Sequence, residues 1–145
     1  MERILPEVDA DFDGIPKVGT GVTIPVGSDS YPATVIWVSD RLVDAQMKND
    51  IGMVFVVRVP KSIRVSGCKY RGVEGHCNAF TESQRYVYYS DIEDESTDHQ
   101  KLVLERNGRE YSYRPGRGYI PVGERARGNQ RIYLGARRAY RDPSF

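Results

Sequence analysis

The sequence predicts a mostly β protein built from antiparallel strands, with at most one or two short helices. Three observations support this fold class: short runs rich in β-branched and aromatic residues, turn residues between these runs, and no sustained helical period. Seven or so such runs in 145 residues fit either a small SH3-like barrel or two packed antiparallel sheets. The length fits one domain that can bury its own core.

The first two runs predict an antiparallel hairpin. Residues 22–24 and 33–38 are rich in β-branched side chains, and the turn residues Gly27-Ser28-Asp29-Ser30 between them predict a wide loop. A hydroxyl at a strand end, followed by an aromatic ring, is placed to meet a bound nucleotide. Ser28 and Tyr31 are therefore candidate ligand-binding residues, and a solvated hairpin tip is the alternative.

The middle of the chain predicts one buried strand between less regular segments. We expect residues 41–49 to form a loop with at most one short helix. Residues 52–59 are the most hydrophobic run, which ends at Pro60 and fits a buried central strand. Residues 61–78 should be irregular, because three glycines interrupt them.

The second half predicts shorter strands. Residues 79–89 and 102–104 read as strands, and Asn107-Gly108 is the residue pair of a type I′ turn, which predicts a hairpin over residues 101–114. Residues 131–134 form the last predicted strand. We divide the chain into an acidic N-terminal arm, residues 1–17, and one β-rich domain, residues 18–145.

Charge is distributed unevenly along the chain. Residues 106–145 hold ten of the 21 basic residues, all arginine, and three of the 20 acidic residues, which makes this arginine-rich third +7 and the rest −6. Guanidinium groups bind phosphate in bidentate fashion and stack on flat rings. The split therefore predicts an anionic partner or an acidic neighbouring subunit.

The sequence carries no motif that predicts catalysis. It lacks the GxSxG, HExxH and GxxxxGK patterns, and Gly19-Thr20-Gly21 matches only half of a dinucleotide fingerprint. Cys68, Cys77 and two histidines make a poor zinc signature, so we expect free thiols, no metal and no cofactor. No apolar run approaches the roughly 20 residues of a membrane span. We expect a non-enzymatic protein in the cytoplasm.

The positive signal is arginine interleaved with tyrosine near the C-terminus. Arg137, Arg138 and Tyr140 belong to this pattern and are candidate ligand-binding residues. Aromatic rings stack on bases while guanidinium groups hold phosphate, so the pattern fits a small nucleotide or a nucleic-acid strand. Ordinary cross-strand packing and solvated arginines explain it as well. The near-neutral total charge favours a compact ligand over a polymer.

Several segments resemble small proteins encoded by phages and prophages. They are residues 18–23, 31–39 and 82–88, the Arg106-Asn107-Gly108-Arg109 turn, and the closing residues 135–145. Among such proteins the chain resembles the Thoeris anti-defence family. The resemblance implies a homo-oligomer in the cytoplasm of an infected bacterium that binds a cyclic ADP-ribose immune signal without cleaving it.

The same resemblance implies a pocket between subunits, with an aromatic residue and arginines around two phosphates. The positions that match are Arg58, Phe80 and Arg109. The amide expected about ten residues after the aromatic is replaced here by Ser90-Asp91, where a carboxylate would repel phosphate. The acidic arm has no counterpart in the family pattern. The alternatives are a β-barrel adaptor for nucleic acid or protein, and a structural phage protein.

Overall fold

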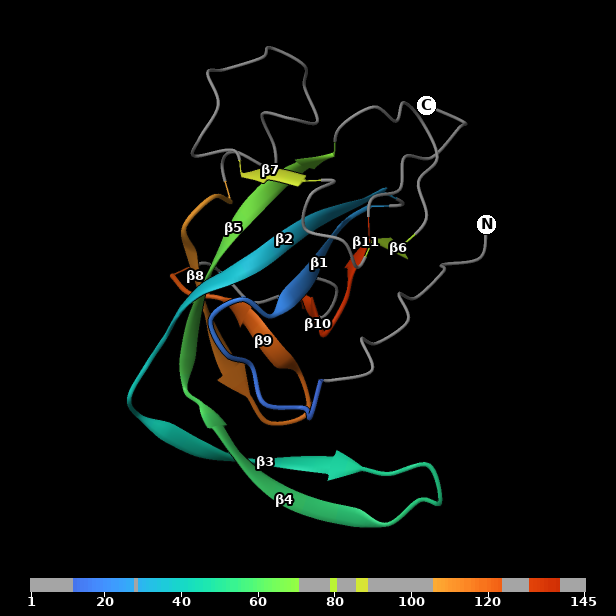
Figure 1. Ribbon diagram of the computed structural model, residues 1–145. Helices are drawn as coiled ribbons and strands as arrows, with labels where there is room; N and C mark the ends of the chain where they lie inside the picture. The colour runs from blue at the N-terminus through green and yellow to red at the C-terminus, as the bar shows by residue number, and fades with distance from the viewer. Residues whose placement is uncertain are drawn as a thin grey trace.

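A computed structural model of the protein describes residues 12–27, 29–70, 79–80, 86–88, 106–123 and 131–138 (Figure 1). Every regular element in these ranges is a β-strand, which confirms the predicted fold class. Most of the strands form one curved antiparallel sheet, a half-barrel, and β3 (Leu42–Lys48) and β4 (Val54–Pro60) form a separate hairpin. The described residues include no helix long and apolar enough to cross a membrane.

The predicted opening hairpin is confirmed as β1 (Gly21–Val26) and β2 (Asp29–Val38). Its loop is shorter than expected, because Val26 pairs directly with Asp29 and only two residues separate the strands. Gly27 has a φ of 59°, the positive value that the first residue of a tight type I′ or II′ connection needs. The right-handed twist of the two strands selects this short connection.

The central strand of the sheet is β5 (Ser62–Tyr70), in a segment that the sequence predicted to be irregular. For residues 62–70 that prediction is wrong, because Ile63 and Val65 point into the core while Arg64 between them is exposed, which is the alternation of a half-buried strand. Residues 71–78 of the same segment lie outside the described ranges. Gly67 is buried inside the strand, opposite Ala33 of β2. The glycine is therefore part of the sheet and does not end the strand.

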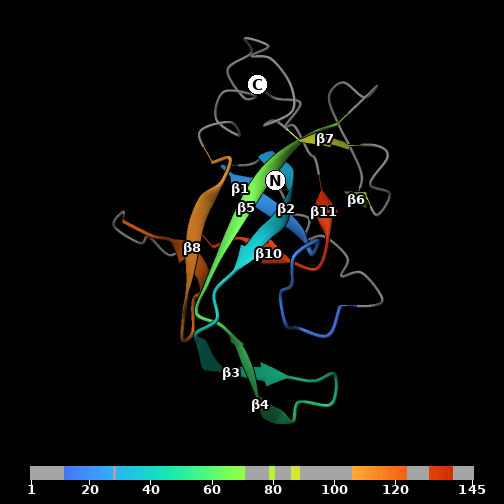
Figure 2. The ribbon, with the colours of Figure 1, turned by 60° about the vertical axis from the view of Figure 1, so that its left-hand side comes forward.

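The remaining strands extend the sheet on both sides of β2 and β5. β8 (Arg109–Arg114) and β7 (Tyr86–Tyr88) pair with β5, β9 (Gly118–Pro121) pairs with β8, and β10 (Tyr133–Leu134) pairs with β1. The path through the sheet is β10-β1-β2-β5-β8-β9. β6 (Ala79–Phe80) and β11 (Arg137–Arg138) form a small separate pair (Figure 2).

Three further predictions can be compared with these strands. The strand expected over residues 79–89 is present as β6 and β7, and residues 81–85 and 89 lie outside the described ranges. Gly108 has a φ of 71° in the expected turn, but the preceding residues 101–105 also lie outside them. The described hairpin in this region is β8–β9, joined by residues 115–117. The last predicted strand, residues 131–134, is confirmed in part, since β10 contains only Tyr133 and Leu134.

The core fills the concave side of the half-barrel. Its centre is the inward-facing side chains of β1, β2, β5 and β8, with the bases of β3 and β4 closing one end. The largest fully buried members are Tyr111, Ile24, Ile63 and Ile120. Ile15 packs against this cluster, and the neighbouring Pro16 is fully buried, so the segment preceding β1 contributes to the core.

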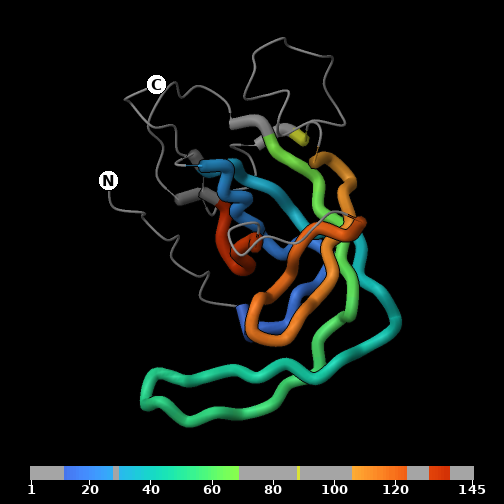
Figure 3. The backbone as a smooth tube through the Cα atoms, turned by 180° about the vertical axis from the view of Figure 1, so that it is seen from behind, coloured from blue at the N-terminus to red at the C-terminus, as the bar shows by residue number. Residues whose placement is uncertain are grey.

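The hairpin of β3 (Leu42–Lys48) and β4 (Val54–Pro60) extends from one end of the sheet, at the bottom of Figure 3. Two predictions for this region are wrong. Residues 41–49 were expected to form a loop or a helical turn and instead contain all of β3. Residues 52–59 were expected to be buried, yet Val54, Phe55 and Val56 are 61%, 45% and 58% exposed.

Candidate functional site

The β3–β4 hairpin has one face toward the core and one toward solvent. Directly opposed residues of an antiparallel pair share a face. The pairs Val43/Val59 and Ala45/Val57 lie on the inner face, where Ala45 and Val59 are 1% exposed. The outer face carries the pairs Asp44/Arg58, Gln46/Val56 and Lys48/Val54. The body of the protein thus fixes the base of the hairpin.

The segment before β1 supports the same inner face further along the hairpin. A Cβ atom built on Gly14 would lie 3.5 Å from the terminal methyl of Met47, so Gly14 packs on that side chain. Met47 and its partner Phe55 lie on the inner face near the tip. The hairpin is therefore held by packing along much of β3 and is preorganised for contact with another molecule.

The tip and β4 expose more apolar surface than the fold requires. Ile51 is 80% exposed, Met53 61%, and the next three residues, Val54 to Val56, follow without a buried position. Taking such fractions of side chains of about 150–200 Å², the exposed apolar area summed over the tip and both faces of β4 is of the order of 500 Å², comparable to the largest patch on a typical monomer. Patches of this size commonly mark interaction sites.

The outer edge of β4 also offers unpaired backbone groups. The amide of Asn49 donates to the Met53 carbonyl at 3.0 Å and the amide of Lys61 to the Arg41 carbonyl at 2.8 Å. These bonds place the odd-numbered residues of both strands in the hydrogen-bonded pairs. The N–H and C=O groups of Val54, Val56 and Arg58 therefore point away from β3, and no described residue pairs with them.

An unpaired strand edge of this kind is a template for strand addition. Natural proteins usually protect such edges with lysine, proline, bulges or a covering loop. Between its first residue and Pro60, β4 has only Arg58 as a charged residue, and Arg58 is paired with Asp44 across the hairpin, Nε to Oδ1 3.7 Å. Both side chains of this ion pair are largely exposed. The edge is therefore nearly uncharged and open.

The β6–β11 pair contains two of the residues expected to bind a ligand. Phe80 lies opposite Arg137 in the register, and Arg138 lies opposite Ala79. The Arg137 side chain is 9% exposed. Its Nε donates to Thr34 Oγ1 at 2.9 Å and its terminal amino group to the Gly19 carbonyl at 3.1 Å. These contacts attach β11 to β2, so Arg137 has a structural role.

Cys68 is buried beside this arginine. Its thiol lies 3.7 Å from Thr34 Oγ1 and is free of any disulfide. Burial raises the pKa of the Cys68 thiol, although the hydrogen bond to Thr34 and the positive charge of Arg137 act in the opposite direction. The thiol is therefore protonated at neutral pH and behaves as a small buried side chain.

The other expected ligand-binding residues are dispersed. Tyr31 is 8% exposed and belongs to the core cluster. Arg58 is on the β3–β4 hairpin, Phe80 is on β6, and Arg109 begins β8, opposite Val65. One copy of the chain thus carries Arg58, Phe80 and Arg109 on three separate elements (Figure 2). Ser28 and Tyr140 lie outside the described residues.

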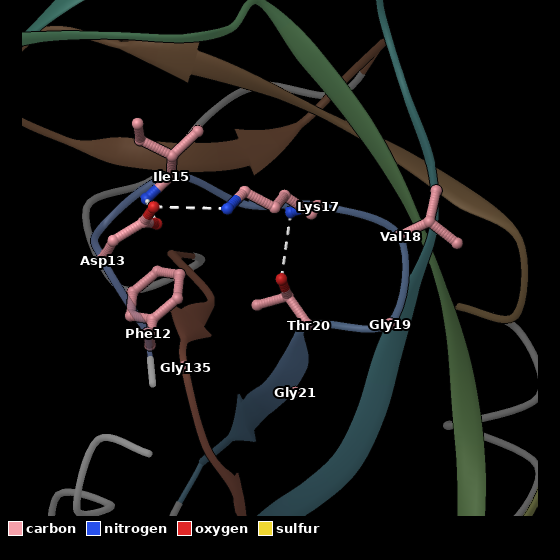
Figure 4. A pocket seen from close by; sticks show the side chains of 9 residues that line it. All are labelled: Phe12, Asp13, Ile15, Lys17, Val18, Gly19, Thr20, Gly21 and Gly135. Atoms are coloured by element: carbon pink, nitrogen blue, oxygen red, sulfur yellow. Dashed lines mark hydrogen bonds and ion pairs between the residues drawn. The ribbon is translucent and has the colours of Figure 1, made fainter. Parts of the chain in front are cut away.

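An open hollow of about 320 Å³ lies between the segment before β1 and Gly135 (Figure 4). The Asp13 carboxylate accepts from the Ile15 amide at 3.0 Å and from Lys17 Nζ at 3.2 Å. The Ile15 bond, followed by the Lys17 bond, lowers the Asp13 pKa. The Lys17 amide donates to Thr20 Oγ1 at 2.9 Å. Polar groups that line the hollow are thus bonded to one another.

No protein-family model, curated protein or solved structure matches this chain. The function is therefore inferred from the surface itself. In the described ranges, no group of three or more His, Cys, Asp or Glu side chains could hold a metal ion. The surface that stands out chemically is the β3–β4 hairpin, with an apolar tip and an open strand edge.

Sequence reasoning missed this surface, although a signal was present. Val43, Ala45 and Met47 alternate with Asp44, Gln46 and Lys48, which is the period of a strand with one covered face. Asn49 to Gly52 then supply turn residues, and Gly52 has a φ of 86°. The alternation and the turn together predict a hairpin, with the hydrophobic run 54–57 as its second strand.

Proposed function

We propose that this protein is a non-catalytic subunit that works by binding another protein chain through its β3–β4 hairpin. The observation that carries the proposal is the run of three exposed apolar residues, Val54 to Val56, on a strand with an open edge. Main-chain hydrogen bonds along such an edge supply affinity, and the exposed side chains supply specificity. Of the sequence hypotheses, this corresponds to the protein adaptor and the structural phage protein.

The way the hairpin is anchored supports this proposal. Ala45 and Val59 fix its base in the core, and the apolar residues that do not contribute to that core are concentrated toward the tip. A rigid element loses little conformational entropy when it binds, so more of the contact energy appears as affinity. A protruding hairpin can also reach a neighbour without moving the half-barrel.

Photocrosslinking tests the proposal directly. A photoreactive amino acid at Ile51, 80% exposed at the tip, should give covalent protein adducts in cells that produce the protein. The same group at Val122, an exposed apolar residue of the body at 44%, is the matched control and should give few. Absence of adducts from Ile51, or equal yields from both positions, would refute a docking role for the hairpin.

A second function, sequestration of a cyclic nucleotide signal, is favoured by one specific observation. The β6–β11 register sets Phe80 opposite Arg137, with Arg138 next in sequence. An aromatic residue and arginines on one small strand pair are the residue types that suit a base and its phosphates. We propose that Phe80 and Arg138 contribute to such a site, with Arg58 and Arg109 of neighbouring subunits completing it in an oligomer.

A thermal-shift series with cyclic and linear ADP-ribose derivatives tests this second proposal. Binding to the native state raises the midpoint of unfolding in proportion to the logarithm of ligand concentration. The increase should disappear in Phe80→Ala and Arg138→Ala. Arg137 is unsuitable for this test, because its substitution would detach β11. Unchanged midpoints of the unaltered protein with every nucleotide would eliminate sequestration.

A further inference from the structure

We infer that the partner of the hairpin is a second copy of this chain, bound by antiparallel pairing of the two β4 edges about Val56. The two hairpins would then form one continuous four-stranded sheet. This inference rests on the proposed function, since it names the protein that the hairpin binds. The pairing is isologous, so it closes into a two-fold dimer and does not propagate into a fibre.

Backbone groups on the edge of β4 match those of a second copy. Val54, Val56 and Arg58 each direct one N–H donor and one C=O acceptor outward. With Val56 opposite Val56 of the second copy, Val54 of each chain lies opposite Arg58 of the other. Each of these pairs then exchanges two hydrogen bonds, as closely spaced antiparallel pairs do.

Neighbouring registers are less favourable. A shift of the two-fold axis to Phe55 places Arg58 opposite Gly52, which belongs to the turn and not to the strand. A shift to Val57 places Val54 opposite Pro60, which has no N–H to donate. A shift to Arg58 opposes two arginines, which is destabilising. Among these registers, the one about Val56 alone pairs the three edge residues with one another, so that every pair can exchange both hydrogen bonds.

Side chains also agree with this register. On the outer face the two Val56 side chains meet, and each Val54 lies beside an Arg58 whose charge is already matched by Asp44. No like charges are opposed. On the inner face Phe55, 45% exposed in the single chain, lies beside Val57 of the other copy. Aromatic and β-branched neighbours of this kind stabilise antiparallel pairs.

The pairing covers few side chains on each copy, so the dimer should be reversible. A standard interface buries about 800 Å² on each partner, and a single added strand buries less than that. We therefore expect a dissociation constant in the micromolar range, about 1–100 μM. Dilution should release monomers, and concentrated protein should be dimeric.

Disulfide trapping tests the register. In the proposed dimer the Cα atoms of the two Val56 residues lie about 5.5 Å apart, within the range that a disulfide bridges. Val56→Cys in a Cys77→Ser background should therefore form a covalent dimer under mild oxidation. Val54→Cys is the matched control, because Val54 lies opposite Arg58 of the second copy and the two Val54 residues are four positions apart along the strand. Equal trapping at both positions, or none at Val56→Cys, would overturn the inference.

Sedimentation velocity tests the edge itself. Val56→Pro removes a donor that points outward and breaks no bond to β3, so it should raise the dissociation constant of the dimer at least tenfold. Gln46→Pro, directly opposite on β3, also removes one outward-pointing N–H group, but from the β3 edge of the hairpin, and should leave the dimer intact. Val56→Thr keeps the N–H group and should also dimerise. Two proline variants that are equally folded and equally dimeric would refute pairing through β4.

These outcomes separate the inference from the proposed function. Adducts at Ile51 whose mass is twice that of the 16.5 kDa chain support both. Adducts of other masses, with no trapping at Val56→Cys, mean that the hairpin binds a different protein and that a second copy of this chain is not its partner. Absence of any adduct together with monomeric protein at all concentrations overturns both.

Discussion

The buried contact between Arg137 and Thr34 provides a stability prediction that can be worked from the structure. Thr34 is 2% exposed, and its hydroxyl accepts from Arg137 Nε at 2.9 Å. Thr34→Val keeps the shape of the side chain but removes the acceptor. A lost hydrogen bond to a charged donor costs about 1.5–3 kcal/mol, and the added methyl recovers under about 1 kcal/mol. The expected net loss is about 1–2 kcal/mol of unfolding free energy.

A double-mutant cycle with Arg137→Met isolates this contact. Without the guanidinium, Thr34→Val should lower the unfolding free energy much less, because the Arg137 donor is absent and only the weak hydrogen bond with the Cys68 thiol is lost. Urea unfolding gives the free energies, and the loss in the single variant corresponds to a fall of about 2–8 °C in the thermal midpoint for a chain of this size. An equal cost of Thr34→Val in both backgrounds would contradict a role for the pair in attaching β11 to β2.

The remaining predictions concern other contacts of the half-barrel. The Tyr119 hydroxyl donates to the Pro60 carbonyl at 2.5 Å, so Tyr119→Phe should lower the unfolding free energy in urea by about 1 kcal/mol; no loss would contradict the bond. Burial, and then Tyr113, raises the Tyr119 pKa, so the native phenol stays protonated above the unfolded pKa of about 10. The advantage of the unaltered protein over Tyr119→Phe is therefore complete below about pH 10 and should shrink as the pH rises further. Gly21→Ala should lower the unfolding free energy by about 1–3 kcal/mol, because the added Cβ would lie 3.1 Å from Arg137 Cγ and 3.3 Å from the Ala136 carbonyl carbon. An unchanged urea midpoint would show that β11 can move away.

The sequence predicted the β fold where local signals agree with the final packing. Residues 22–24 and 33–38 are β-branched, flank a glycine turn, and become β1 and β2 as expected. Part of their pairing is also local, since β1 pairs with β2, the next strand along the chain. In such segments propensity, turn chemistry and burial favour the same structure.

Prediction failed where burial departs from hydrophobicity. Residues 52–59 are the most hydrophobic run and were predicted to form a buried central strand, but they lie on a protruding hairpin where Val54, Phe55 and Val56 are about half exposed. The central strand is β5, in which the polar Ser62 and Arg64 alternate with the inward-facing Ile63 and Val65 and interrupt the hydrophobic run in the sequence. Which strand occupies the centre depends on long-range pairing of β5 with β2 and β8, and a single sequence does not reveal that pairing.

The ligand-binding candidates were chosen by residue type and by place in the sequence, and the fold buries two of them, Arg137 and Tyr31. Arg137 was selected for its charge, but the fold uses it inside the protein to hold Thr34 and the Gly19 carbonyl. Tyr31 was selected for its place next to a turn, but the strand alternation turns its ring into the core. Composition identifies groups that can bind phosphate, whereas register decides which of them face solvent.

Hydrogen exchange of the β4 amides tests the account most directly, by comparing protein at about 1 μM with protein well above the expected micromolar dissociation constant. The amides of Val54, Val56 and Arg58 should become protected as concentration rises, because each gains a partner in the second copy. The amides of Asp44, Gln46 and Lys48, on the other edge of the same hairpin, should exchange at the same rate throughout. Unchanged exchange at the β4 edge, or equal protection of both edges, would contradict docking through β4.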